Sequence, residues 1–156
     1  MAREYPELPV VAVGVVLLDG DRVLLVQRAR PPGAGRWTVP GGAVAVGETL
    51  REAAARELLE ETGVACALGP VVEVLERVVR DESGRPRWHY VIIDFLGTHP
   101  VGRLSPSSDA ACARFVPVAE LADYETTDGL APVIDRAREL LDGKTPPPYE
   151  PPPATD

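Results

Sequence analysis

Two apolar runs near the start of the chain are long enough to form buried strands. Residues 10–18 are apolar apart from Gly14, and a second, largely apolar run at 22–27 follows the tripeptide Asp19-Gly20-Asp21. Aspartate followed by glycine between two hydrophobic runs favours a tight β-hairpin turn. Neither run alternates regularly with polar residues, so the pattern predicts a hairpin that is buried on both faces.

A second hairpin is predicted further along the chain. Residues 71–81 and 87–96 are rich in β-branched and aromatic residues, and residues 82–86 between them carry the turn formers Ser, Gly and Pro. Alternation along the second arm places Tyr90, Ile92, Asp94 and Leu96 on one face. Asp94 within such a run is either hydrogen-bonded in the core or directed at a functional site.

Turn and cap signals enclose a candidate helix at residues 49–62. Pro40-Gly41-Gly42 predicts a turn before it, because glycine adopts turn conformations most easily. Thr49 is a suitable N-cap residue, and Gly63 stands where a left-handed residue commonly ends a helix. The segment therefore predicts a loop, a helix and a second loop.

Two further helices and a tail complete the predicted organisation. Residues 117–122 predict a short helix, and apolar residues at helical spacing predict a longer one at 130–141. Six of the last twelve residues are proline, which predicts a disordered tail at 145–156. With an N-terminal extension at 1–9, the predicted domain covers residues 10–144.

Three glutamates share one surface of the candidate helix. At about 100° per residue, Glu57, Glu60 and Glu61 fall within an arc of about 100°. Like charges at this spacing destabilise a helix, whereas a bound divalent cation would remove the conflict, because Mg²⁺ prefers oxygen ligands. The alternative is a solvated acidic face in which Arg56 bridges Glu52 and Glu60.

Composition limits the classes of partner and metal. A chain of 156 residues predicts one domain, and a net charge of −8 argues against general nucleic-acid binding. An anionic substrate must then be met by a metal or by local arginines such as Arg28 and Arg30. Cys66 and Cys112 lack a metal-binding spacing, so a zinc site is not predicted. The sequence shows no apolar leader and no membrane span, and we expect a cytoplasmic protein.

The spacing of these polar residues resembles the Nudix box, a motif of the Nudix hydrolase family. The resemblance extends to the flanking segments and covers residues 10–141. It implies an α/β (α+β) fold, a single-domain α/β/α sandwich with a mixed sheet, and Mg²⁺-dependent hydrolysis, with Mn²⁺ as a substitute metal. The positions that carry the motif are Gly42, Glu48, Arg56-Glu57-Leu58, Glu60-Glu61 and Gly63-Val64.

The resemblance implies roles for several of these residues. Glu57, Glu60 and Glu61 match the positions that hold Mg²⁺ and help to activate water. Arg56 matches the arginine that orients them, and Glu48 matches a position with an accessory or structural role.

Roles outside the helix are more open. Gly41 and Gly42 either approach the metal or a phosphate closely or form an ordinary tight turn. Asp109 resembles the position of an acid that acts as a base in some relatives, against the alternative of a solvated loop carboxylate. Arg28 and Arg30 are candidate phosphate contacts, against the alternative of ordinary surface arginines.

The motif indicates phosphate and metal but not the leaving group. Residues 88–95 resemble a strand in relatives grouped with ADP-ribose pyrophosphatases, which favours a nucleoside diphosphate linked to another moiety as the substrate. The alternatives are a pyrophosphohydrolase of oxidised nucleoside triphosphates and a non-catalytic nucleotide sensor. The oligomeric state stays open, with a homodimer as one alternative.

Overall fold

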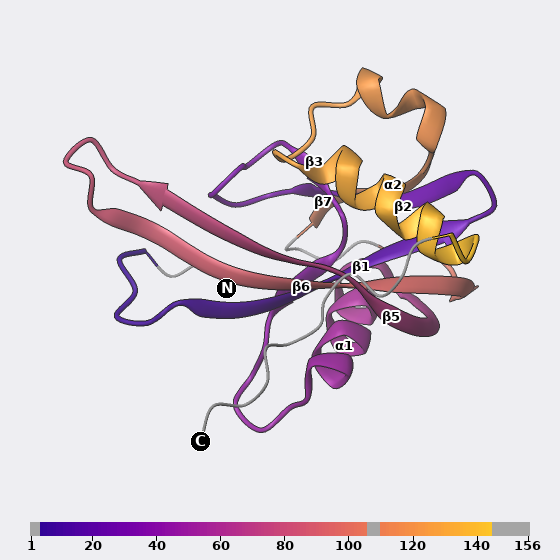
Figure 1. Ribbon diagram of the computed structural model, residues 1–156, viewed down its shortest axis with the longest axis horizontal. Coiled ribbons are helices and arrows are strands. Elements are labelled where there is room, and N and C mark those ends of the chain that lie inside the picture. Colours follow the sequence, from indigo (N-terminus) through magenta and orange to yellow (C-terminus); the bar gives the residue numbers. More distant parts are fainter. Residues whose placement is uncertain (1–3, 106–109, 145–156) are drawn as a thin grey trace.

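A seven-stranded mixed sheet forms the centre of the computed structural model, which describes residues 4–105 and 110–144 (Figure 1). The main path of the sheet has the order β3-β2-β1-β6-β5, while β4 pairs with β1 and β7 pairs with β2. Strands β1 and β6 are parallel and the other pairs are antiparallel. The strands are β1 (Val10–Asp19), β2 (Arg22–Arg28), β3 (Trp37–Thr38), β4 (Gly41–Ala43), β5 (Val64–Arg80), β6 (Pro86–Gly102) and β7 (Ala110–Pro117).

Two helices cover opposite faces of this sheet, as Figure 1 shows. Helix α1 (Leu50–Thr62) begins after Thr49, whose side chain accepts a hydrogen bond from the Glu52 amide, and ends at Gly63 with a φ of 76°. Helix α2 spans Leu130–Leu141, as predicted. The predicted short helix is a 3₁₀ helix, η1 (Val118–Asp123).

Each helix completes its own hydrophobic core. Strand β1 contributes to both cores because successive side chains point to opposite faces, which explains its unbroken apolar run. Val13, Val15 and Leu17 pack with Ala54 and Leu58 of α1 in one cluster. The other cluster combines strand residues with α2 and contains Val16, Leu18, Leu25, Val116, Val133 and Ile134. The predicted three-layer fold is confirmed.

Both predicted hairpins are present, but the second is longer than the sequence indicated. The first joins β1 and β2 across Asp19 and Arg22. In the second, β5 begins directly after Gly63, so the loop expected behind α1 is absent. The strand starts seven residues before the predicted arm at 71–81 and passes Gly69-Pro70 with a shift of register between Leu68 and Val71. An edge strand accepts such a bulge because its outer hydrogen-bonding groups have no partner strand.

Several predictions fall at the ends of the chain or between the described segments. Asp109 and the predicted tail at 145–156 lie outside the described residues. In the predicted N-terminal extension, the Tyr5 amide donates to the Arg87 carbonyl at 2.7 Å, so residues next to β1 contact the second hairpin. None of the helices in the described segments has the length and apolar character needed to span a bilayer. The domain limits and the cytoplasmic location stay predictions.

Candidate active site

An open cleft of about 460 Å³ lies where β1, β2 and β4 meet α1, the β5–β6 hairpin and the start of α2. Its volume is within the range of pockets that hold small-molecule ligands. Glu57, Glu60 and Glu61 line it from α1. The other predicted site residues that line it are Gly41, Gly42, Arg28 and Arg30.

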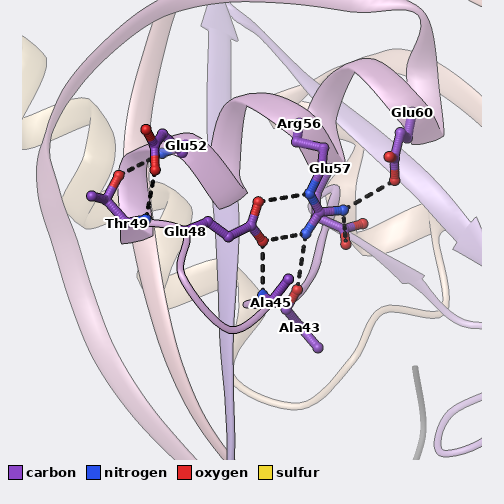
Figure 2. A network of polar contacts seen from close by, with 8 residues as sticks. All are labelled: Ala43, Ala45, Glu48, Thr49, Glu52, Arg56, Glu57 and Glu60. Atoms are coloured by element: carbon purple, nitrogen blue, oxygen red, sulfur yellow. Dashed lines mark hydrogen bonds and ion pairs between the residues drawn. The ribbon is translucent and has the colours of Figure 1, made fainter.

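Arg56 organises the acidic side of this cleft, and Figure 2 shows the contacts. Its guanidinium forms two hydrogen bonds with Glu48, from Nη2 to Oε1 at 2.6 Å and from Nε to Oε2 at 2.9 Å. Its Nη1 donates to Glu57 at 2.8 Å and to Glu60 at 3.1 Å. The alternative in which Arg56 bridges Glu52 and Glu60 is confirmed for Glu60 and wrong for Glu52. The Glu52 carboxylate accepts a hydrogen bond from the Thr49 amide instead.

Glu48 and Arg56 act as a support for the cleft wall. Hydrogen bonds from Arg56 and from the Ala45 amide lower the pKa of Glu48 to about 2. The carboxylate therefore stays ionised over the whole physiological range and fixes the guanidinium, whose pKa is raised mainly by Glu48 and Glu57. A fixed guanidinium in turn holds Glu57 and Glu60 in the cleft, which agrees with a positioning role for Arg56.

Gly41 and Gly42 belong to strand β4, so the predicted tight turn is wrong. A methyl group at Gly41 would overlap the Val13 carbonyl oxygen of the paired strand, and one at Gly42 would lie 2.5 Å from the Glu57 carboxylate. These positions need glycine because other groups approach them closely, not because of an unusual φ. The Gly41 amide also donates to Glu61 at 3.0 Å.

The donor set fits a divalent cation. Glu48, Glu57 and Glu60 place three carboxylates around the guanidinium of Arg56, and Glu61 accepts a hydrogen bond from the Gly41 amide in the same cleft. Hard cations favour such oxygen donors. Among the described residues no group of three or more His, Cys, Asp or Glu side chains is gathered closely enough to hold a metal. Glu60 can reorient more easily than Glu57, because 59% of its side chain is exposed against 16% for Glu57.

Two predicted arginines differ in their surroundings. Arg28 is half-buried, and its Nε donates to the Pro32 carbonyl at 2.7 Å. Burial lowers the pKa of Arg28, with Tyr90 and Glu61 opposing that effect. Arg30 is exposed at the rim of the same cleft. Of the two, the half-buried Arg28 is better placed to bind an anionic ligand than the exposed Arg30.

The structure adds two cleft residues that were not assigned roles from the sequence. Arg77 lines the cleft from β5, directly opposite Tyr90 of β6. Asp94 also lines it, with only 4% of its surface exposed, and its Oδ1 has no hydrogen-bond partner. Burial raises the pKa of Asp94 to about 7, partly opposed by Arg77. Of the two alternatives for Asp94, the structure favours a residue directed at a site.

Comparison with known proteins decides the family. Residues 8–137 match the NUDIX domain. The chain belongs to the Nudix family. Nudix hydrolases act on small nucleotides and generally use divalent cations. The prediction of a Nudix hydrolase is confirmed.

Individual relatives of this Nudix chain carry different names. It is 37% identical over 107 residues to an "ADP-ribose pyrophosphatase" of Methanocaldococcus jannaschii, covering 69% of this chain and 61% of the relative. The chain thus spans less than two thirds of that protein. It is 53% identical over 118 residues to a "Putative 8-oxo-dGTP diphosphatase 2" of Mycobacterium tuberculosis, covering 74% of this chain and 78% of the relative.

Solved structures agree on the fold. The crystal structure of the MutT NUDIX hydrolase from Burkholderia pseudomallei superimposes with a TM-score of 0.70 at 24% identity, covering 83% of this chain and 98% of that chain. At this identity the comparison establishes the architecture alone. It places the present sheet and helices within the Nudix fold.

The burial of Asp94 gives this Nudix chain a testable pH dependence of stability. The pKa of Asp94 is ordinarily 3.8 and is about 7 in the folded state. At a pH between these two values, Asp94 carries a proton in the folded protein that it has released in the unfolded chain. The free energy of unfolding therefore falls as pH rises through this window, by at most about 4 kcal/mol from this group. Asp94→Asn removes the titration and keeps the shape.

We expect the variant to unfold at a higher temperature than the wild type at pH 8, with the difference shrinking toward pH 4. Thermal melts of both proteins across this pH range measure the effect. An unchanged or lower melting temperature of the Asp94→Asn variant at pH 8 would show that the carboxylate is well compensated in the folded state.

Proposed function

We propose that the protein hydrolyses the phosphoanhydride of a nucleoside diphosphate linked to another moiety, with ADP-ribose as the representative substrate and Mg²⁺ as the metal. The observation that carries this proposal is the placement of Glu57, Glu60 and Glu61 in one cleft with the half-buried Arg28. Acidic and basic groups that line one cleft can bind a metal and the phosphates that it accompanies.

The glutamates of α1 divide the work between metal binding and water activation. Glu57, Glu60 and Glu61 would hold Mg²⁺, with backbone atoms of Gly42 beside them because no side chain intervenes. When bound, the metal supplies charge neutralisation of the phosphates and lowers the pKa of a coordinated water. Arg56 orients Glu57 and Glu60 through the hydrogen bonds from its Nη1.

The remaining groups bind the phosphates and accept a proton. Arg28 and Arg30 line the cleft and would contact the phosphates as they gain charge, and Gly41 of β4 lines the same cleft. Water attacks phosphorus, the bridging P–O bond breaks, and the proton of the water passes to a carboxylate. Asp109 is a further candidate base, proposed on the family resemblance alone.

A second substrate class is supported by a specific observation. The relative named for 8-oxo-dGTP is 53% identical over 118 residues, whereas the relative named for ADP-ribose is 37% identical over 107 residues. An oxidised nucleoside triphosphate is therefore the alternative substrate. The same glutamates and arginines would serve either substrate, because they contact phosphate rather than the leaving group.

A direct comparison of kcat/KM distinguishes the two substrates. With ADP-ribose and 8-oxo-dGTP assayed at the same Mg²⁺ concentration, we expect ADP-ribose to be the better substrate and to yield a nucleoside monophosphate and a sugar phosphate. Liquid chromatography of the products identifies the broken bond. A preference for the triphosphate of more than about tenfold, or ~1.4 kcal/mol in transition-state binding, would replace the first substrate by the second and keep the hydrolase assignment.

A further inference from the structure

Asp94 is the one carboxylate among the buried residues of the described segments. The other buried polar residues, Thr62 and Thr127, both take part in hydrogen bonds: the Thr62 hydroxyl donates to the Leu58 carbonyl, and the Thr127 hydroxyl bonds the hydroxyl of Thr38. Asp94 Oδ1 is as deeply buried and has no partner. A buried acceptor without a donor is costly, which makes Asp94 Oδ1 a candidate contact for a bound ligand.

The neighbouring strand is adapted to the Asp94 side chain. Strands β1 and β6 run in parallel with Gly14 paired to Asp94. A methyl group at Gly14 would overlap Asp94 Oδ1, so only glycine leaves room for the carboxylate at this point. Gly14 interrupts an otherwise apolar strand for this purpose. Two adjacent strands are thus shaped around one unpartnered oxygen on the floor of the cleft.

The residues next to Asp94 on the β5–β6 hairpin change from apolar to polar with distance from Asp94. Ile92 lies two residues before Asp94 on the same face of β6 and pairs with Leu75 of β5. Tyr90 lies two residues further along that face and pairs with Arg77. All five residues line the cleft that also contains the α1 glutamates. An apolar pair of this kind suits the flat face of an aromatic ring, and the carboxylate suits polar hydrogens at the edge of that ring.

We propose that Asp94 recognises the nucleobase of the substrate by accepting hydrogen bonds from an amino-bearing edge, as adenine and guanine present. The base lies against Leu75 and Ile92, and the phosphates extend toward Glu57, Glu60 and Glu61. The inference rests on the proposed function, because it places a nucleotide in this cleft. It adds a specificity-determining residue that acts on the base and leaves the reacting phosphates to the glutamates.

The expected specificity arises because a carboxylate and a carbonyl of the base are both hydrogen-bond acceptors and cannot bond each other. An amino group donates to Asp94. Hypoxanthine carries a carbonyl acceptor where adenine has its amino group, and it lacks the 2-amino group of guanine, so it offers one donor fewer than guanine. A hydrogen bond to a charged group that is lost in a buried site weakens binding by about 10- to 100-fold. The wild type should therefore discriminate against bases that lack the amino group.

Equilibrium binding of nucleoside monophosphates tests this recognition without hydrolysis. AMP, GMP and IMP are titrated by calorimetry into the wild-type chain and into the variants Asp94→Asn and Asp94→Ala, at a pH well above the Asp94 pKa of about 7 so that the carboxylate is ionised. We expect AMP or GMP to bind the wild type at least about tenfold more tightly than IMP, and the preference to fall below about threefold in both variants. Thr127→Val is the matched control, since Thr127 is buried in the same cleft, and it should keep the wild-type preference.

Each outcome decides the inference separately from the hydrolase assignment. A wild type without preference among the three nucleotides, or variants that weaken all three equally and keep the preference, would overturn the role of Asp94. If the Asp94→Ala variant does not fold, the isosteric Asp94→Asn variant gives the same comparison. Failure of the proposed function appears instead as absence of turnover with every nucleotide tested, which these binding measurements do not depend on.

Discussion

Replacing Glu57, Glu60 or Glu61 individually with glutamine should lower kcat by at least about 100-fold while the protein stays folded. Each substitution removes one negative charge from the wall of the cleft and keeps the size of the side chain. Because the three carboxylates are proposed to hold one metal and its water, loss of any one weakens the whole arrangement. Steady-state kinetics with ADP-ribose at saturating Mg²⁺ measures the effect.

The fold should tolerate these changes for reasons visible in the structure. Arg56 keeps its two hydrogen bonds to Glu48 whichever of the other glutamates is replaced. Glu52→Gln is the matched control on the same helix, because glutamine at this position still completes the capping box with Thr49. Near-normal turnover in all three cleft variants would reduce this surface to an ordinary acidic helix face.

Local signals allowed much of the fold to be predicted. The cap at Thr49, the left-handed Gly63 and the apolar spacing of α2 each depend on residues close in the sequence, and the predicted bounds of both helices hold. The Asp-Gly turn likewise fixed the first hairpin. The family resemblance implied a mixed sheet, but the parallel pairing of β1 with β6 could not be read from the sequence.

Long-range packing explains what the sequence did not predict. Gly41 and Gly42 resemble turn residues in the sequence, yet they form strand β4. Glycine is needed there because Val13 of β1 and Glu57 of α1 approach closely, and the sequence does not show that these elements meet. Arg77 was overlooked for the same reason, since its place in the cleft depends on pairing with Tyr90 across the hairpin. Asp94 was recognised as unusual, but its missing partner became apparent only in three dimensions.

Hydrogen bonds offset part of the negative charge on the acidic wall of the cleft. Arg56 Nη1 is shared between Glu57 and Glu60, and the Gly41 amide donates to Glu61. Each of these three glutamates therefore accepts a hydrogen bond that offsets part of its charge. A single guanidinium cannot balance all of these carboxylates together, so the cluster keeps a negative surplus that a divalent cation would neutralise.

Removal of divalent metal should abolish turnover, and addition of Mg²⁺ or Mn²⁺ should restore it. The negative surplus on α1 otherwise repels the phosphates of the substrate, and hard oxygen donors have little affinity for monovalent cations under the same conditions. Activity is measured after treatment with a chelator and after return of each metal in excess over the chelator.

Thermal stability gives a second readout that does not depend on catalysis. A ligand that binds only the folded state raises the melting temperature, by more as its concentration rises above its Kd, so Mg²⁺ should stabilise the metal-free wild type. The same addition should have a smaller effect on Glu57→Gln and an undiminished effect on Glu52→Gln. Full turnover in excess chelator would exclude metal-assisted hydrolysis by this cleft, and equal stabilisation of all three proteins would place the metal elsewhere on the chain.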